Sequence, residues 1–353
     1  MAVLEIKAGR QAYKHIRRNG LQTEDVKAVV AAAGGPKWFT TYGLMRFILG
    51  DLLKEAAHPI QFLGSSVGSW QMACGLTEDP VQALDRLRDS YAGYIYSNDP
   101  GPEEISEACG QIIQAMLADQ TRNILNHPSR TLHVITARGK GWLSASSKWQ
   151  KGIGFGWAWI LNAFSRGNIN QVVDRVVFSN KKDLPYDHEA DLLSTSNILL
   201  SAENLLHALR ASGAIPFLMK GINDISGSRV GSYWDGGITD YHISLPFKSD
   251  GIVLNPHFLP YVLEGWLDKK LPWTRIASRE NMSNVLLIHP SKEYVNTLPR
   301  KQISDLRDFY HYGEDQEARI NYWSEISERS LELGAYFKEL IESGNISSVI
   351  QPY

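Results

Sequence analysis

Cysteine is scarce in this sequence, and long apolar or strongly basic runs are missing. The chain of 353 residues contains only two cysteines, Cys74 and Cys109, which lie far apart and predict a reducing compartment rather than a disulfide framework. No uninterrupted apolar run reaches the ~20 residues that a membrane-spanning helix needs. Residues 1–20 are too polar to contain the apolar core of a signal peptide. These absences predict a cytoplasmic protein and leave peripheral contact with a membrane surface open.

Nucleic acids and phosphate-bearing cofactors are also unexpected. The formal net charge is −2 and no dense run of Lys and Arg occurs, so we expect no nucleic-acid partner. The glycine turn "AAGGPKW" at 32–38 has neither the G-x-x-x-x-G-K-[ST] spacing of a nucleotide loop nor the G-x-G-x-x-G of a dinucleotide site. No cluster of His, Cys, Asp and Glu has metal-ligand spacing, so no metal and no other cofactor is expected.

The rest of the sequence is typical of a globular α/β protein, with 43% hydrophobic and 21% charged residues. Short apolar runs typical of strands alternate with segments of helical period. Strands are expected in 26–35, 58–64, 131–139, 171–180, 229–237, 251–257 and 284–290, and helices in 38–56, 69–76, 81–97, 103–119, 204–215 and 317–343. This alternation predicts a three-layer fold, with a mainly parallel central sheet flanked by helices.

A tryptophan-rich segment at 141–164 departs from this alternation. It contains four of the ten tryptophans, many glycines and few charges. One interpretation is an aromatic insertion into the core. The other is a lid or an interfacial patch with peripheral membrane contact, because Trp favours the boundary between water and acyl chains. The apolar stretch 153–164 is too short to span a bilayer.

The conformation of this segment decides which rings share a face. On a helix, Trp157 and Trp159 would point about 200° apart. One helical stripe would then contain Ile153, Gly156, Trp157 and Ile160. The glycines favour hinge-like mobility over a stiff helix.

The stretch "GSSVG" at 64–68 has the G-x-S-x-G pattern, with Ser66 at its centre. A serine at a sharp strand-to-helix turn holds its hydroxyl clear of the backbone, and the small residues Gly64 and Gly68 relieve crowding. The N–H groups at the start of the following helix favour developing negative charge. The pattern therefore predicts a nucleophile, although a structural turn of small residues is the alternative.

Two other glycine turns supply groups that such a serine needs. "AAGGPKW" at 32–38 follows an apolar strand, and its N–H groups could stabilise an oxyanion; a plain tight turn is the alternative. "YWDGGITD" at 233–240 presents Asp235 at a strand end, where a carboxylate could accept the proton of the serine. An ordinary turn aspartate is the alternative for Asp235.

Together these motifs resemble the patatin-like phospholipase family, and a fourth block extends the resemblance. That family has a D-G-G-G-x-[RK]-G oxyanion loop, then G-x-S-x-G, then A-S-x-A-x-P, then D-G-[GA]. This sequence has "AAGGPKW", "GSSVG", "ASGAIP" at 211–216 and "DGG" at 235–237 in that order. The resemblance covers 26–246. It implies a patatin-like acyl hydrolase domain over 1–280, and we expect 281–353 to add a final strand and a helical extension that packs on the same domain.

The resemblance implies a role for each matching residue. Ser66 becomes the nucleophile and Asp235 the general base of a dyad without histidine, and the N–H groups of Gly34 and Gly35 become the oxyanion donors. The family's basic position falls on Lys37. The supporting glycines are Gly64, Gly68, Gly236 and Gly237.

Some positions depart from the family pattern. Ala32 replaces the leading Asp of the oxyanion loop, Pro36 has no N–H, and Trp38 replaces the closing glycine. These changes predict an atypical loop and a narrower pocket mouth. Asp240 stands where the family commonly has Asn, and we expect it to be a satisfied turn carboxylate.

An aspartate with the ordinary pKa near 3.9 is a weak base at neutral pH. A dyad therefore requires Asp235 to lie close to Ser66 in a partly desolvated site that raises its pKa. A Ser–Asp–His triad is the alternative, with His257 or His289 as the histidine, because both follow Asp235 and lie at the ends of apolar strands.

The sequence thus predicts a serine acyl hydrolase that cleaves carboxylic esters of lipids, such as phospholipid or lysophospholipid acyl chains, through an acyl-Ser66 intermediate. Acyl transfer to an alcohol by the same dyad is a second hypothesis. A catalytically silent lipid-binding or scaffold protein is a third, suggested only by the altered oxyanion loop. The head group, the chain length and the oligomeric state stay open.

Overall fold

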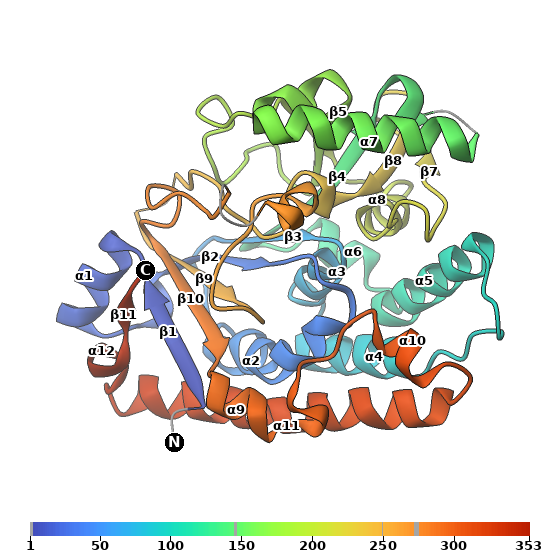
Figure 1. Ribbon diagram of the computed structural model, residues 1–353. Helices are drawn as coiled ribbons and strands as arrows, with labels where there is room; N and C mark the ends of the chain where they lie inside the picture. The colour runs from blue at the N-terminus through green and yellow to red at the C-terminus, as the bar shows by residue number, and fades with distance from the viewer. Residues whose placement is uncertain (1–2, 145–146, 249, 272–274) are drawn as a thin grey trace.

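The computed structural model describes residues 3–144, 147–248, 250–271 and 275–353 (Figure 1). In this part of the chain a single sheet contains eleven strands. Its main path runs β11-β1-β10-β9-β2-β3-β4-β5-β6, while β8 pairs with β4 and β7 with β8. The strands are β1 (Leu4–Ala8), β2 (Val26–Ala31), β3 (Ile60–Ser65), β4 (Arg130–Gly139), β5 (Val173–Ser179), β6 (Thr195–Leu199), β7 (Ile222–Asn223), β8 (Ser232–Asp235), β9 (Ile252–Pro256), β10 (Val285–Pro290) and β11 (Gln351–Pro352).

The centre of the sheet is parallel, as the alternation of strands and helices predicts. β10, β9, β2, β3 and β4 are neighbours and run in the same direction. Antiparallel pairs occur on both sides of this centre, where β1 joins β10 and β5 joins β4. The predicted α/β class is therefore confirmed, in the form of a large, mostly parallel mixed sheet flanked by helices.

Alternate residues of the central strands supply different cores. In β2, Val29 and Ala31 join the large core on one face, whereas Ala28 and Val30 join a smaller core on the other. This alternation follows from the two-residue period of a strand, and it buries both faces. The apolar run of 26–35 is consequently a strand only as far as Ala31, where the glycine turn begins.

The principal helices lie on both sides of the sheet (Figure 1). The large core is covered by α2, α3, α4, α5 and α11, while α7 lies at the opposite side of the molecule in the view of Figure 1. The helices are α1 (Arg10–Asn19), α2 (Tyr42–Phe47), α3 (Val67–Cys74), α4 (Pro80–Gly93), α5 (Pro102–Leu117), α6 (Thr121–Leu125), α7 (Lys148–Phe164), α8 (Leu205–Ser212), α9 (Lys292–Thr297), α10 (Asp308–Tyr312), α11 (Gln316–Glu342) and α12 (Ile346–Val349). Short 3-10 turns complete the chain, including η1 (Thr23–Asp25), η4 (Gly141–Ser144), η5 (Arg166–Gln171), η6 (Gly236–Ile238), η7 (Trp266–Lys270) and η8 (Pro299–Lys301).

Two parts of the sequence prediction need correction. The segment 38–56 is not one regular helix. It begins in a 3-10 turn, η2 (Gly35–Thr41), continues as α2 and ends in a π-helical turn, η3 (Ile48–Leu52). The strands β1 and β6 and the helix α1 were not expected. The polar sequence of β1, "LEIKA", alternates in burial because only one of its faces meets the core.

Helix α11 crosses α2 at very short range. A Cβ at Gly43 would lie 2.0 Å from the carbonyl oxygen of Ser330, so only glycine fits there. The two helices are joined at this point by a hydrogen bond of 2.8 Å from the N–H of Gly43 to Oγ of Ser330. Within the described ranges, no helix combines the length and the apolar character that crossing a bilayer requires.

Candidate active site

The sequence GSSVG forms a sharp turn between β3 and α3. Ser66 stands between the last residue of β3 and the first residue of α3, and its backbone has φ 56° and ψ −134°. A positive φ is unfavourable for a residue with a side chain, so the turn holds Ser66 in a strained conformation. Strain of this kind persists where the surrounding structure requires it, and it is frequent at functional sites.

The two glycines of this motif are required by close packing. A Cβ at Gly68 would lie 2.3 Å from the carbonyl oxygen of Ala31 in β2. A Cβ at Gly64 would lie 2.4 Å from the backbone nitrogen of Ser69. A larger residue at either position would therefore displace α3 from the sheet and move Ser66 with it.

Strand β4 aligns Ser66 with Asp235. Ser65, the last residue of β3, is opposite Ile135 of β4. β8 pairs with the next part of β4, where Asp235 is opposite Thr136. The GSSVG and DGG motifs, about 170 residues apart in the sequence, thus lie beside neighbouring residues of β4.

The side chains of Ser66 and Asp235 contact each other directly. Oγ of Ser66 donates a hydrogen bond of 2.7 Å to Oδ2 of Asp235. The other carboxylate oxygen, Oδ1, accepts a hydrogen bond of 2.7 Å from the N–H of Gly237, and the N–H of Asp235 donates to the carbonyl of Ala214. A Cβ at Gly236 would lie 2.3 Å from the carbonyl oxygen of Ile135, which explains a glycine there.

The surroundings of Asp235 favour its protonated form more than water does. Burial raises the pKa of Asp235 to about 6, while the hydrogen bonds from Ser66 and Gly237 and the positive charge of Lys269 act in the opposite direction. At neutral pH the carboxylate is still largely ionised and can accept a proton. Its pKa is nevertheless closer to neutrality than that of an ordinary aspartate, which suits a general base.

The glycine turn after β2 lies beside Ser66. Gly34 and Gly35 line the same cavity as Ser66 and Asp235, and Gly35 has φ 55°. Among the described residues, neither of the two N–H groups has a backbone acceptor. Both are therefore available to bind an oxyanion that forms next to Ser66.

The cavity at Ser66 is small, with a volume of about 130 Å³. Besides the motif residues, its lining combines apolar side chains with two lysines and an aspartate: Ile215, Pro216, Ile238, Tyr241, Trp266 and Leu306, with Lys37, Lys269 and Asp305. Trp38 is not part of this lining among the described residues, because its ring is buried in the large core. Trp38 therefore adds no side chain to this cavity, and the narrower mouth expected from the altered loop stays a prediction.

Lys37 forms contacts on the rim of the cavity. Its Nζ lies 3.2 Å from Oδ2 of Asp305 and donates a 3.4 Å hydrogen bond to the hydroxyl of Tyr241. Burial lowers the pKa of Lys37, but Tyr241 and Asp305 outweigh this effect, so the pKa is raised overall. Lys37 is consequently a cation at neutral pH, and its ion pair with Asp305 joins the glycine turn after β2 to the C-terminal part of the chain.

Neither candidate histidine reaches the pair of Ser66 and Asp235. Nδ1 of His257 lies within hydrogen-bond distance of the backbone of Leu259, and Nδ1 of His289 lies 3.0 Å from the carbonyl of Pro290. Burial lowers the pKa of His257 to about 3. Moreover, the direct contact of Ser66 with Asp235 leaves no space for an imidazole between them. The geometry therefore favours the dyad over the triad.

Asp240 is a buried carboxylate with strong partners. Its two oxygens accept hydrogen bonds of 2.7 and 2.8 Å from the guanidinium of Arg175, and both side chains are buried. The N–H of Asp240 donates to the carbonyl of Gly236. The expected satisfied carboxylate is present, and it also attaches the turn that follows Asp235 to strand β5.

No sequence motif indicated that four of the cavity residues would lie near Ser66. Trp266 and Lys269 come from η7, while Asp305 and Leu306 come from the segment between η8 and α10. They carry no local motif, and only the tertiary fold brings them to Ser66. A search for apolar and charged residues after the DGG block would have included these four among many others.

The tryptophan-rich segment consists of η4 and α7, and Ala145 and Ser146 lie outside the described residues. The expected hinge-like chain is instead a regular helix over Lys148–Phe164. Its inner face is held by packing, because Phe155 and Ala158 are buried against Trp234 and Ile238. These contacts outweigh the low helix propensity of its glycines.

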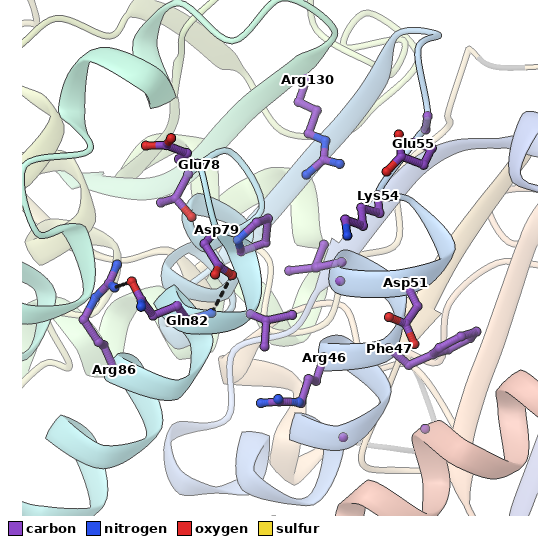
Figure 2. A pocket seen from close by; sticks show the side chains of 18 of the residues that line it. Arg46, Phe47, Asp51, Lys54, Glu55, Glu78, Asp79, Gln82, Arg86 and Arg130 are labelled. Carbon is purple, nitrogen blue, oxygen red and sulfur yellow. Dashed lines mark hydrogen bonds between the residues drawn. The ribbon is translucent and has the colours of Figure 1, made fainter.

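A second, larger depression of about 1400 Å³ lies between η3, the start of α4 and α11 (Figure 2). Charges of both signs line it, and several have partners of their own. Asp79 accepts a hydrogen bond from the N–H of Gln82, and Arg130 donates to the carbonyls of Leu53 and Gly75. No described residue lines both this depression and the cavity at Ser66. The two sites are therefore separate.

The part of the chain that the structure describes contains no group of three or more His, Cys, Asp and Glu side chains arranged to hold a metal ion.

Comparison with known proteins finds no protein-family model and no curated protein that matches the chain.

Proposed function

We propose that the chain is a serine acyl hydrolase with a patatin-like fold, acting on carboxylic esters of lipids. The observation that carries this proposal is the 2.7 Å hydrogen bond from Ser66, in its strained turn, to the buried carboxylate of Asp235. The order of the four sequence blocks agrees with it, and so does the position of Gly34 and Gly35 beside Ser66.

The reaction would begin at Oγ of Ser66. As Oγ attacks the ester carbonyl carbon, its proton passes to Oδ2 of Asp235, and the N–H groups of Gly34 and Gly35 stabilise the oxyanion. The tetrahedral intermediate then expels the alcohol, which takes the proton from Asp235, and leaves an acyl-Ser66 ester. Asp235 next accepts a proton from water, the hydroxide attacks the acyl carbon, and Oγ leaves with that proton.

The lining of the cavity supports a lipid-like ester. Ile215, Ile238, Trp266 and Leu306 offer apolar surface to an acyl chain near its carbonyl, while Lys37 and Lys269 offer positive charge to an anionic group. The cavity itself holds little more than the reacting group, so the remainder of a long acyl chain would lie outside its 130 Å³.

The test is active-site labelling with a fluorophosphonate, followed by a panel of lipid esters. Ser66→Ala should lose both labelling and ester hydrolysis while keeping its melting temperature. Ser65→Ala is the matched control, because Ser65 is the adjacent buried serine in β3, and it should keep both. Labelling that persists in Ser66→Ala would contradict the proposal. Products with a second alcohol as acceptor would instead indicate acyl transfer.

A further inference from the structure

The outer face of α7 is a continuous apolar stripe. Its residues are spaced four, four, three and four apart, which places them on one side of a helix: Trp149, Ile153, Trp157, Ile160 and Phe164. Trp149 is 66% exposed and Phe164 is 82% exposed. Trp142, in the neighbouring turn η4, is 57% exposed as well.

Packing among the described residues does not explain this stripe. The opposite face of α7 supplies Phe155, Ala158 and Leu161 to the core, and Nδ2 of Asn162 donates a 2.6 Å hydrogen bond to Asp268 in η7. The helix is therefore anchored by one face and presents large apolar rings on the other. Large exposed apolar patches on a soluble domain commonly mark a binding surface.

The charge pattern indicates which partner fits. From residue 120 to residue 173 the chain contains no Asp or Glu, and Lys148 and Lys151 belong to the first turn of α7. An apolar helical face rich in tryptophan, with lysine and without acidic residues, has the composition of a helix that lies in the interface of an anionic bilayer.

We propose that the outer face of α7 (Trp149, Ile153, Trp157, Ile160 and Phe164) docks on an anionic lipid bilayer, with the helix axis in the plane of the interface. The rings enter the boundary between head groups and acyl chains, while the inner face keeps its contacts with the protein.

This surface is connected to the cavity at Ser66 by two contacts. The ring of Phe155 in α7 packs on that of Phe217 at 5.1 Å between centroids, and Phe217 follows Ile215 and Pro216 of the cavity lining. The second contact is the hydrogen bond from Asn162 of α7 to Asp268 of η7, the turn that supplies Trp266 and Lys269 to the cavity. Docking does not depend on catalysis, although it would bring the proposed hydrolase to its lipid.

The experiment measures binding separately from chemistry by using Ser66→Ala as the parent protein. Parent protein is sedimented with vesicles of phosphatidylcholine, with and without an equal share of phosphatidylglycerol, at low and high salt. We expect binding to the anionic vesicles that weakens at high salt. Adding Trp149→Ser, Trp157→Ser and Phe164→Ser together should reduce the partition coefficient by at least about tenfold, because three exposed rings are lost.

Tyr310→Ser is the matched control, since Tyr310 is 87% exposed on α10, an element remote from α7 in Figure 1, and it should bind as the parent does. Quenching of tryptophan fluorescence by brominated acyl chains should be strong in the parent and weak in the triple variant. Unchanged partition in a folded triple variant would overturn the proposal. The proposal would also be overturned if the parent protein did not bind vesicles and light scattering showed it to be a dimer, while the triple variant remained a monomer.

Discussion

The hydroxyl of Ser212 joins the backbone of Ser66 to the neighbouring strand β4. It accepts a hydrogen bond of 2.9 Å from the N–H of Ser66 and donates one of 2.7 Å to the carbonyl of Ile135 in β4. All three groups are buried, so the hydroxyl satisfies two polar backbone groups that water does not reach. Ser212 belongs to the block ASGAIP, and this bridge gives that block a physical role.

We therefore predict that Ser212→Ala weakens catalysis and stability together. The variant leaves the N–H of Ser66 without this partner, which should lower the free energy of unfolding by about 1–3 kcal/mol. Displacement of Ser66 should reduce kcat by roughly 10²-fold with a smaller change in KM. Ester kinetics and chemical denaturation measure the two effects.

Ser330→Ala is a matched control for this prediction. Oγ of Ser330 also accepts a buried backbone N–H, that of Gly43, and donates to a carbonyl, that of Ser327. Its loss should lower stability to a similar extent and leave kcat unchanged. Equal losses of kcat in both variants would show that the effect of Ser212 is general destabilisation.

A second prediction separates the dyad from the triad. Asp235→Asn should reduce kcat/KM by roughly 10³-fold or more, because the amide cannot accept the proton of Ser66. His257→Gln and His289→Gln should retain most of the activity, since neither imidazole contacts Ser66 or Asp235 in the described structure. A comparable collapse of rate in either histidine variant, with the melting temperature maintained, would favour the triad.

A third prediction concerns the pH dependence of the rate. Because the pKa of Asp235 is about 6, kcat/KM should rise with pH through about 6 and level off above it. Lys269 lowers this pKa through its positive charge, so Lys269→Gln should move the rising limb to higher pH. Lys182→Gln, an exposed lysine elsewhere, should leave the limb in place. A limb that stays fixed or moves to lower pH in Lys269→Gln would contradict the assignment of the base.

A fourth prediction concerns stability. The native pKa of Asp235, about 6, is above the ordinary value, so the folded state binds this proton more tightly than the unfolded chain does. The contribution of Asp235 to the free energy of unfolding is therefore complete below about pH 4 and is lost as the pH rises through 6. Relative to wild type, Asp235→Asn should gain up to about 3 kcal/mol between pH 4 and pH 8.

Denaturant titrations of both proteins across this pH range measure the difference, and pH effects that they share cancel. A gain that grows with pH would identify Asp235 as a group whose burial lowers stability for the sake of reactivity. A difference that is constant over the range would show that the pKa of Asp235 is not raised.

The sequence was sufficient to single out Ser66 and Asp235, which the structure brings into direct contact. Ser66 needs small neighbours and a strand-to-helix turn, and Asp235 needs a strand end followed by glycines, so both leave a readable pattern. The alternating runs were likewise sufficient for the α/β class, because burial on both faces of a parallel sheet imposes apolar strands.

The remaining features depend on contacts that no local pattern records. Leu306 lines the cavity only because the segment after η8 crosses the glycine turn that follows β2, where Oγ of Ser304 donates to the carbonyl of Pro36. Trp38 replaces the closing glycine of the family loop, yet the sequence alone did not show that its ring stacks on Phe39 inside the core. Tertiary packing also made α7 helical against its glycines.

The pairing of β1 with β10 has a consequence for synthesis. Leu4–Ala8 finds its antiparallel partner only in residues 286–290, whereas β2, β3 and β4 can pair once residue 139 has emerged. On the ribosome, β1 therefore has no antiparallel partner during most of translation. Pairing between segments so far apart in the sequence is slow. Asp305 and Leu306 emerge later still. The growing chain would thus carry Ser66 and Asp235 for some time before the wall of their cavity exists, and it would gain a complete pocket only in a late step of folding.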